Sequence, residues 1–450
     1  MTTYDTVISK RIIIDQVLLI GNKKTKPHII LRELSFHQGD TLLSSDTSNL
    51  FSRTRNNVFN TQLFTEVNSE IYTSDSLHYI FVLKLKERWY FWPIPIIELA
   101  DRNFNEWVQE RGADLSRINF GIDFRQENFR GRNEELHIKL QTGFTKKYEL
   151  FYTIPYIDKN RKTGIKFFTS YSTNKIVAYE TSENKLQYHE SEQIARKRFY
   201  GGVSFSRRSK LYGKHEIGLR YKDNYISDTL RDLNPNYFLD NRNNQQYFEL
   251  RYRFKYDKRD LKNYALNGHF TEIQLDQSGL GIFDDIKQFE VYLTHSRYWT
   301  LSNRSFLSSM VSGQYSIPQI QPYANNRALG YNEDFVRGYE LYVVDGQKYV
   351  LNRNEFKIKL YDRTTNIEGY VGENPFSTIP LQVYIKAYVD LGWANDASYG
   401  QLNPLLNNQL LSGIGTGIDF VTFYDAVFRL EYSINALREH GFFFHVGSSF

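Results

Sequence analysis

The residues with the clearest chemical potential in this chain of 450 residues are one arginine and two carboxylates. Arg337 lies in a Val-Arg-Gly-Tyr run at 336–339, and Glu355 and Asp390 follow in two segments that alternate apolar and polar residues. A guanidinium is a planar fork that can hold two carboxylates through charge-assisted hydrogen bonds, whereas a lysine offers only a point charge. Gly338 would allow a tight backbone turn beside the arginine. This pattern predicts that ion pairs fasten the segment around Arg337 to the two segments that carry Glu355 and Asp390.

The alternation in both segments predicts where the two carboxylates point, because successive side chains of a strand face opposite sides of the sheet. In the segment 381–392 the apolar residues have odd numbers, so Asp390 and Gly392 face the other side, together with Tyr384, Lys386 and Tyr388. Glu355 shares its side with Lys357 and Lys359. If the two segments are neighbouring strands, both carboxylates lie on the same face of one sheet.

No other pattern predicts a catalytic or metal site. The 10 histidines are scattered, and no pair has metal-ligand spacing with supporting carboxylates. We find no phosphate-binding glycine loop, nucleophile elbow or pair of catalytic carboxylates, and the absence of cysteine excludes disulfides and thiol chemistry. The net charge of +5 is modest and does not indicate nucleic acid. We therefore expect no enzyme, no metal site and no cofactor.

Composition indicates an envelope protein that crosses a membrane with strands. Hydrophobic residues make up 41% of the chain, with 34 Tyr and 33 Phe, yet no apolar stretch approaches the roughly 18 residues that a spanning helix needs. From residue 89 onward, segments of about ten residues alternate in polarity between polar turns. Because the first residues show no signal-peptide pattern, this interpretation requires that a signal was removed.

The predicted fold class is mainly β, a transmembrane barrel of roughly sixteen antiparallel strands over residues 89–450. A soluble sandwich would also alternate, but here charged residues cluster on one face in strand after strand, and the other face is aromatic at both ends, as a membrane girdle requires. The chain ends on Phe450 in an amphipathic segment, which resembles the sorting signal of outer-membrane barrels. We expect the basic inward residues Arg251, Arg253 and Lys255 to be balanced by other charges in the lumen.

Residues 1–88 follow a different pattern. A strand at 12–20 precedes two segments with helical spacing, at 27–36 and 46–59, and a hairpin at 63–85. The order β-α-α-β-β resembles a POTRA domain, as do the runs Gly21–Lys26 and Asn60–Val67; another small α+β module is the alternative. The resemblance implies a periplasmic domain whose strand edges bind an extended client by strand addition, at Ile14, Val17 and Leu83.

The barrel part resembles the BamA/TamA outer-membrane family, in a Bacteroidetes-like form. Arg337 matches the arginine of the family's loop motif, and Glu355 and Asp390 match the acidic residues of the next two strands. Asp257–Asp260 matches a recurrent segment, and Asp101–Trp107 looks like the first barrel strand. The resemblance implies that the loop 318–348 folds into the lumen and is held there by a latch of Arg337, Gly338, Tyr339, Glu355, Asp390 and Gly392.

The same resemblance implies outer-membrane protein assembly, insertion or polypeptide translocation without nucleotide, in the bacterial outer membrane. The machine would open at a lateral seam between the first and last strands, at Ile96, Phe104, Gly441 and Phe450. Its partners would be unfolded or β-barrel client polypeptides, outer-membrane lipid and accessory lipoproteins, but no nucleic acid. The alternative is a non-catalytic barrel that serves as a scaffold, a surface partner platform or a plugged pore, because insertases of the family usually carry several POTRA domains.

Overall fold

The computed structural model describes residues 11–43, 46–73, 75, 77–99, 104–109, 111–158, 162–331, 333–367, 378–422 and 426–446. The chain forms two compact units. One comprises Met1–Phe91, Gln126–Glu135 and Asn366–Thr378, and the other comprises Trp92–Arg125, Leu136–Thr365 and Ile379–Phe450. Within the described ranges, no helix is both long enough and apolar enough to cross a membrane.

The first unit contains a four-stranded sheet and two helices. Its elements are β1 (Arg11–Ile20), α1 (Pro27–Leu31), β2 (Thr41–Leu43), α2 (Thr47–Phe59), β3 (Phe64–Thr73) and β4 (His78–Glu87). The strand order is β2-β1-β4-β3, with β1 parallel to β4 and the other pairs antiparallel. Apolar side chains of the helices and strands form its core, where the ring centroids of Phe51 and Phe81 lie 4.9 Å apart. The short strand β2 was not predicted.

The pairing corrects two of the three predicted strand-edge residues. Leu83 lies on the central strand β4, between Leu19 of β1 and Ser69 of β3, and Ile14 donates its backbone N–H to Asp40 at 3.0 Å on the β2 side. Both side chains are fully buried, because β1 and β4 form the middle of the sheet. Val17 lies on β1 beyond the last residue that pairs with β2. The edges of this sheet are therefore β3 and the second half of β1.

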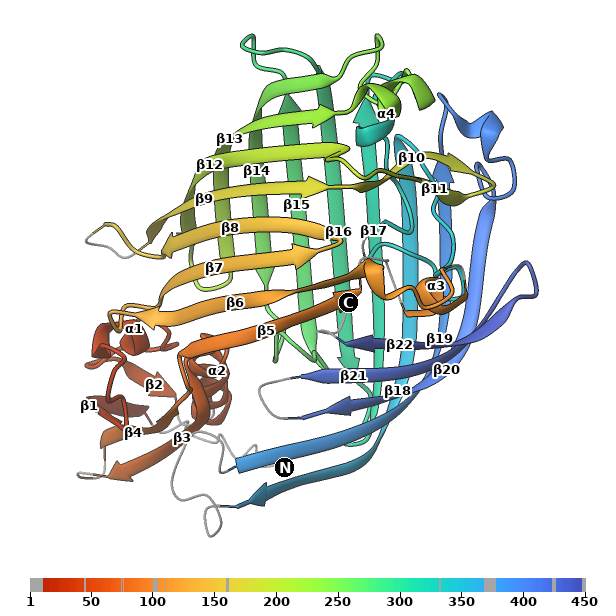
Figure 1. Ribbon diagram of the computed structural model, residues 1–450. Helices are drawn as coiled ribbons and strands as arrows, with labels where there is room; N and C mark the ends of the chain where they lie inside the picture. The colour runs from red at the N-terminus through yellow and green to blue at the C-terminus, as the bar shows by residue number, and fades with distance from the viewer. Residues whose placement is uncertain are drawn as a thin grey trace, which may run out of the picture. The chain divides into compact units, whose positions relative to one another are not determined.

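The second unit is built on an antiparallel sheet of sixteen strands that wraps into a barrel (Figure 1), which confirms the predicted strand number. From one end of the sheet to the other, its strands are β5 (Phe91–Leu99), β6 (Ile118–Phe129), β7 (Glu134–Gly143), β8 (Thr145–Ile154), β9 (Thr163–Asn174), β12 (Arg196–Ser209), β13 (Gly213–Ile226), β14 (Asn244–Asp257), β15 (Gly268–Ser278), β16 (Gln288–Thr300), β17 (Ser305–Ile317), β18 (Lys348–Asn366), β19 (Thr378–Asn395), β20 (Leu410–Val421), β21 (Val427–Asn435) and β22 (His440–Val446).

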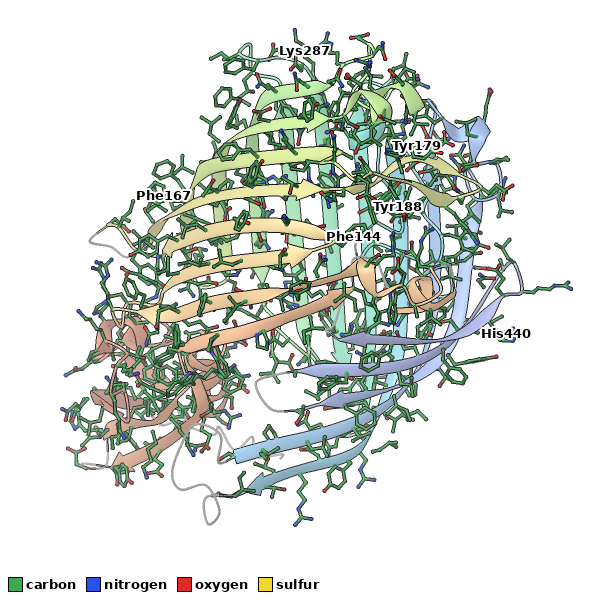
Figure 2. The ribbon with its side chains drawn as sticks, viewed as in Figure 1. Phe144, Phe167, Tyr179, Tyr188, Lys287 and His440 are labelled. Carbon is green, nitrogen blue, oxygen red and sulfur yellow. The ribbon has the colours of Figure 1, made fainter. Side chains whose placement is uncertain are left out.

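Burial alternates along the barrel strands as the sequence predicts. On β19, Lys386 and Asp390 are buried while Ile385 and Val389 are exposed. Side chains project from both faces of the wall (Figure 2), and Phe167 of β9 is one of the exposed aromatic residues. The polar face therefore lines the interior of the barrel and the apolar face surrounds it, which is the arrangement that a lipid environment stabilises.

The connections contain several smaller elements. The predicted long gap 224–245 corresponds to the connection between β13 and β14, which holds α4 (Asp228–Leu233), and the gap 318–348 corresponds to the connection 318–347, which holds the 3-10 helix η3 (Tyr323–Asn325). Two further short 3-10 helices are η2 (Leu115–Arg117) and η4 (Gly400–Leu402). Between β9 and β12 an unpredicted hairpin of β10 (Ile176–Ser182) and β11 (Lys185–Glu190) forms its own two-stranded sheet.

The predicted first barrel strand is wrong in position. We expected it near 96–104, including the segment Asp101–Trp107, but β5 ends at Leu99 and Phe104 begins the helix α3 (Phe104–Gln109). The apolar residues at 104, 107 and 108 have helical spacing, which the expectation of an all-strand region overlooked. The short helices α3 and α4 also interrupt the succession of alternating segments predicted from residue 89 onward. Phe450 lies outside the described residues.

Candidate functional site

The connection 318–347 turns back against the inner face of the barrel. Leu329 and Val344 form an isolated antiparallel bridge, which brings the two arms of the connection together. Val336 and Tyr339 are buried in an apolar cluster with wall residues that include Leu351 of β18, Ala394 of β19 and Leu411 of β20. This packing places the predicted loop motif inside the barrel.

Arg337 reaches three strands of the wall from the tip of this connection. Its Nε and Nη2 donate to the two carboxylate oxygens of Asp390 at 2.7 and 2.6 Å, and its backbone N–H donates to the same carboxylate at 3.1 Å. Its Nη1 donates to Glu355 and, at 3.2 Å, to Glu431. The guanidinium also lies 3.8 Å from the ring centroid of Tyr388. One side chain thus binds β18, β19 and β21 at once.

Lysines of the wall complete the charge balance around these carboxylates. Lys386 Nζ lies 2.8 Å from both Asp419 and Glu431, and Lys357 Nζ lies 2.8 Å from Glu355. We refer to the buried groups as the latch cluster, with the cations Arg337, Arg353, Lys357 and Lys386 and the anions Glu355, Asp390, Asp419 and Glu431. Four cations face four anions, so the buried network is neutral when all its members are ionised.

This balance decides the ionisation of the arginine. Burial alone lowers the pKa of Arg337, but the charges of Glu355 and Asp390 outweigh it and raise the pKa well above its ordinary value. A buried charge without a partner is costly, so removal of one member should destabilise the remaining ones. The latch cluster can therefore act as one unit that fastens the connection to the wall.

Three glycines allow the loop tip to approach the wall closely. Gly338 has a backbone φ of +98°, and its carbonyl accepts a hydrogen bond from Asn435 Nδ2 at 2.7 Å. A Cβ atom at Gly413 would lie 1.9 Å from the carbonyl oxygen of Arg337. Gly392 lies directly beneath Val336 of the same tip. Of the alternating glycines of β20, Gly413 thus gives space to the inserted connection, whereas Gly415 and Gly417 lie against residues of the neighbouring wall strands.

Sequence reasoning missed Glu431, Asp419, Lys386 and Lys357 as members of the cluster. Strand parity does predict that Lys386 and Glu431 face inward, but register decides whether they meet. In the observed register Gly417 stands between them, paired with Lys386 on one side and Glu431 on the other. Because glycine has no side chain, the lysine can reach across β20 to the carboxylate. The available sequence signal was an inward-facing glycine on one strand, with inward-facing charges of opposite sign on the strands before and after it.

The hairpin β10–β11 makes a second set of contacts with the inserted connection. Its tip residue Asn184 exchanges hydrogen bonds with Val343, accepting at 2.8 Å through its carbonyl and donating at 3.0 Å through Nδ2. Its backbone N–H donates to Asn403 Oδ1 at 2.8 Å in the connection between β19 and β20, toward which the hairpin extends (Figure 1). No sequence signal identified these contacts, because the hairpin itself was not predicted.

The predicted seam residues are not members of the latch cluster. Ile96 is on β5 and Gly441 is on β22, the two end strands of the sheet, while Phe104 is on α3, which contacts β22. In the described part of the chain, no group of three or more His, Asp or Glu side chains could hold a metal ion. The contacts of Arg337 with Glu355 and Asp390 are charge-assisted hydrogen bonds, which can fasten the connection to the wall.

Comparisons with known proteins agree with this architecture. Residues 128–450 match the Omp85 superfamily domain. The fold is similar to that of BamA from Haemophilus ducreyi lacking POTRA domains 1-3, with a TM-score of 0.54, 15% identity, and coverage of 98% of this chain and 85% of that one. It is also similar to CdiB from Escherichia coli, with a TM-score of 0.57, 12% identity, and coverage of 98% and 76%. No curated protein sequence matches.

Proposed function

The chain belongs to the Omp85 superfamily, whose β-barrels lie in the bacterial outer membrane and insert or translocate proteins, and we propose that it passes client polypeptides through a lateral seam between β5 and β22. The step needs no nucleotide, because strand pairing with the client supplies the driving free energy. The observation that carries the proposal is the composition of the two strands at the ends of the sheet.

Both end strands are poorly suited to a strong closing ladder. β5 contains Pro93 and Pro95, which have no N–H to donate, and within the part of the chain that the structure describes β22 has 7 residues, against 12 in β20. A seam with few hydrogen bonds separates at low cost. A client strand can then replace the missing partner by β-augmentation, with a geometry that does not depend on its sequence.

The unit that contains β1–β4 would serve as a POTRA-like domain in the periplasm, corresponding to residues 1–88. Its two sheet edges, β3 and the second half of β1, would bind extended clients in place of the predicted edge at Ile14 and Leu83. Exposed apolar residues follow both edges: Ile20 is 53% exposed on β1, and Tyr72 is 52% exposed on β3. These side chains offer weak, sequence-tolerant contacts to a client.

The latch cluster has a defined role in this proposal. It ties the inserted connection to β18, β19, β20 and β21, which are the strands that precede β22 in the sheet. This part of the wall would stay rigid while β22 separates from β5. Arg337, Gly338, Tyr339, Glu355, Asp390 and Gly392 therefore act as positioning residues for the seam.

Reconstitution into liposomes tests the proposal. The rate at which an unfolded client barrel inserts, measured by its resistance to protease, should rise when the protein is present. Arg337→Ala should lower that rate, whereas the surface variant Lys197→Gln on the outer face of β12 should not. Equal rates in empty liposomes and in liposomes with the protein would refute client insertion.

A plugged pore is the second candidate function, favoured by the connection 318–347 that fills part of the lumen. For a pore, Arg337→Ala should open a large single-channel conductance and leave client insertion at the rate of empty liposomes. An unchanged conductance together with a lower insertion rate would exclude the pore and favour the seam.

A further inference from the structure

A second cluster of cations lines the barrel interior. Unlike the latch cluster, it contains more cations than nearby carboxylates. A cavity of about 470 Å³ lies between the wall and the inserted connection. Its basic residues are Lys147 on β8, Arg196 and Arg198 on β12, Arg220 and Lys222 on β13, and Arg327 in the connection 318–347. The cavity is within the range of about 300–1,000 Å³ that is usual for small-molecule sites.

Nearby carboxylates neutralise only part of this charge. Glu149 lies 3.0 Å from Lys147, and Glu249 lies 2.6 Å from Lys222 and 3.5 Å from Arg220. Two carboxylates therefore form ion pairs with three of the six cations, and Arg196, Arg198 and Arg327 form none with the residues that the structure describes. Buried charges of one sign without partners are unfavourable unless an anion compensates them.

The two arginines of β12 show the imbalance most clearly. Arg198 pairs in register with Ser172 on β9 and Asn224 on β13, which are both neutral. Its guanidinium makes no hydrogen bond or ion pair to any residue that the structure describes, and its Nε is buried. Arg196 donates to Tyr237 Oη at 3.3 Å and Asn174 Oδ1 at 3.2 Å, again to neutral groups.

Basic residues in neighbouring rows of the same wall do contact carboxylates, so the lack of acidic partners is local. Arg251 on β14 donates to both oxygens of Asp276 at 2.7 and 2.6 Å. Arg253 and Lys255 both contact Glu272 on β15, at 3.2 and 2.9 Å. Each of these three basic residues thus contacts a carboxylate, as expected, whereas Arg196, Arg198 and Arg327 have no ion pair with any residue that the structure describes.

The remaining lining suits a compact anion. Serine, asparagine and glutamine side chains and the hydroxyls of Tyr200 and Tyr247 line the cavity between the cations, and no Asp or Glu is among its lining residues. An apolar cluster with Leu230, Phe238 and Tyr323 adjoins it. Guanidinium groups that converge from wall and connection present planar forks, which match the oxygens of phosphate groups.

We propose that this cavity binds a multiply charged phosphate-bearing anion, held by Arg196, Arg198 and Arg327. Because Arg327 belongs to the connection 318–347 and the other two belong to β12, the bound anion joins the connection to β12, whereas the latch cluster joins it to β18–β21. The phosphate can belong to a free soluble molecule or to a lipid headgroup. The inference is independent of the client-handling proposal.

Calorimetry on the whole protein tests the site. The chain is reconstituted in nanodiscs of zwitterionic phosphatidylcholine, in buffer free of phosphate and sulfate, and titrated with sodium pyrophosphate. Arg198→Gln should weaken binding by about tenfold or more, because one charge-assisted hydrogen-bonding group is lost. Lys197→Gln removes the neighbouring charge on the outer face and should leave the affinity unchanged. Arg198→Lys keeps the charge and should give an intermediate affinity if the folded site is intact.

A second arm separates the two sources of phosphate. Nanodiscs that also contain phosphatidic acid are examined by native mass spectrometry for lipid retained on the protein. Loss of pyrophosphate binding in Arg198→Gln supports a soluble ligand, and loss of retained phosphatidic acid in the same variant supports a headgroup. If Arg198→Gln matches Lys197→Gln in both arms, or if neither probe binds the native protein, the proposal is overturned.

Discussion

A double-mutant cycle between Arg337 and Asp390 should reveal strong coupling. Arg337→Ala removes two charge-assisted hydrogen bonds to Asp390 and leaves four buried anions with three cations. Loss of one partner from a buried pair costs about 3–5 kcal/mol. Asp390→Ala should cost less, toward 3 kcal/mol, because the arginine keeps Glu355 and Glu431 as partners.

The double variant restores charge balance, with three cations facing three anions. The loss of unfolding free energy in the double variant should therefore be about 2–3 kcal/mol smaller than the sum of the two single losses. This interaction energy is at the upper end of the range for residues in contact. The assay is the free energy of unfolding from urea titration in lipid vesicles, together with hydrogen exchange of the amides at 329–345. Exchange at these amides should rise in both single variants.

Arg251→Ala with Asp276→Ala provides the matched control. This pair has the same two-pronged geometry, but both residues lie on wall strands, β14 and β15. Its cycle should also be coupled, yet the exchange at 329–345 should stay at the native level. Additive costs for Arg337 and Asp390, or loop exchange that does not change, would refute a fastening through this ion pair.

Three further variants test other contacts of the inserted connection. Gly413→Val should expel the loop tip, because its Cβ would meet the Arg337 carbonyl at 1.9 Å; limited trypsin digestion should then cleave at 337, whereas Ile414→Val on the outer face should remain resistant. Asn184→Ala should loosen the hairpin β10–β11 and so increase single-channel conductance. The substitution leaves the Val343 carbonyl and the Leu406 N–H without their partner, which should destabilise the contact by about 1–3 kcal/mol. A conductance equal to that of the native protein would contradict this role. Burial raises the pKa of Asp345 to about 7, against the hydrogen bonds from Tyr331 and Thr181. A raised acid pKa means that the folded state holds the proton more tightly, so protection of the connection from exchange should be greatest below about pH 4 and fall up to about pH 7. Asp345→Asn should remove that dependence, and a persistent one would assign it to another group.

Barrel architecture could be predicted from the sequence because strand parity is local. The alternation in 381–392 correctly placed Lys386 and Asp390 inside the barrel, and the count of alternating segments gave sixteen strands. The same reasoning failed at Phe104, where an aromatic segment after two prolines was assigned to a strand although its spacing is helical. A segment of six residues is too short for its apolar pattern to distinguish the helical period from the strand period.

The site could be predicted only in part, because contacts across strands depend on register and on loops. Arg337 with Glu355 and Asp390 followed from a motif resemblance together with parity. The contact of Lys386 with Glu431 across Gly417 required the pairing of three strands. Leu83 was placed at an edge because the sequence does not reveal which strand of a four-stranded sheet becomes central.

Cysteine cross-linking in native membranes tests most directly whether the connection is held inside the barrel. The chain contains no cysteine, so the pair Val336→Cys and Gly392→Cys reports one contact only. A Cβ at 392 would lie 2.4 Å from Val336 Cγ2, within reach of a disulfide after a small adjustment. We predict near-complete cross-linking of this pair and none for Val336→Cys with Ile385→Cys, whose second residue faces outward on the same strand. Failure of the first pair to cross-link in the folded, membrane-embedded protein would contradict the account.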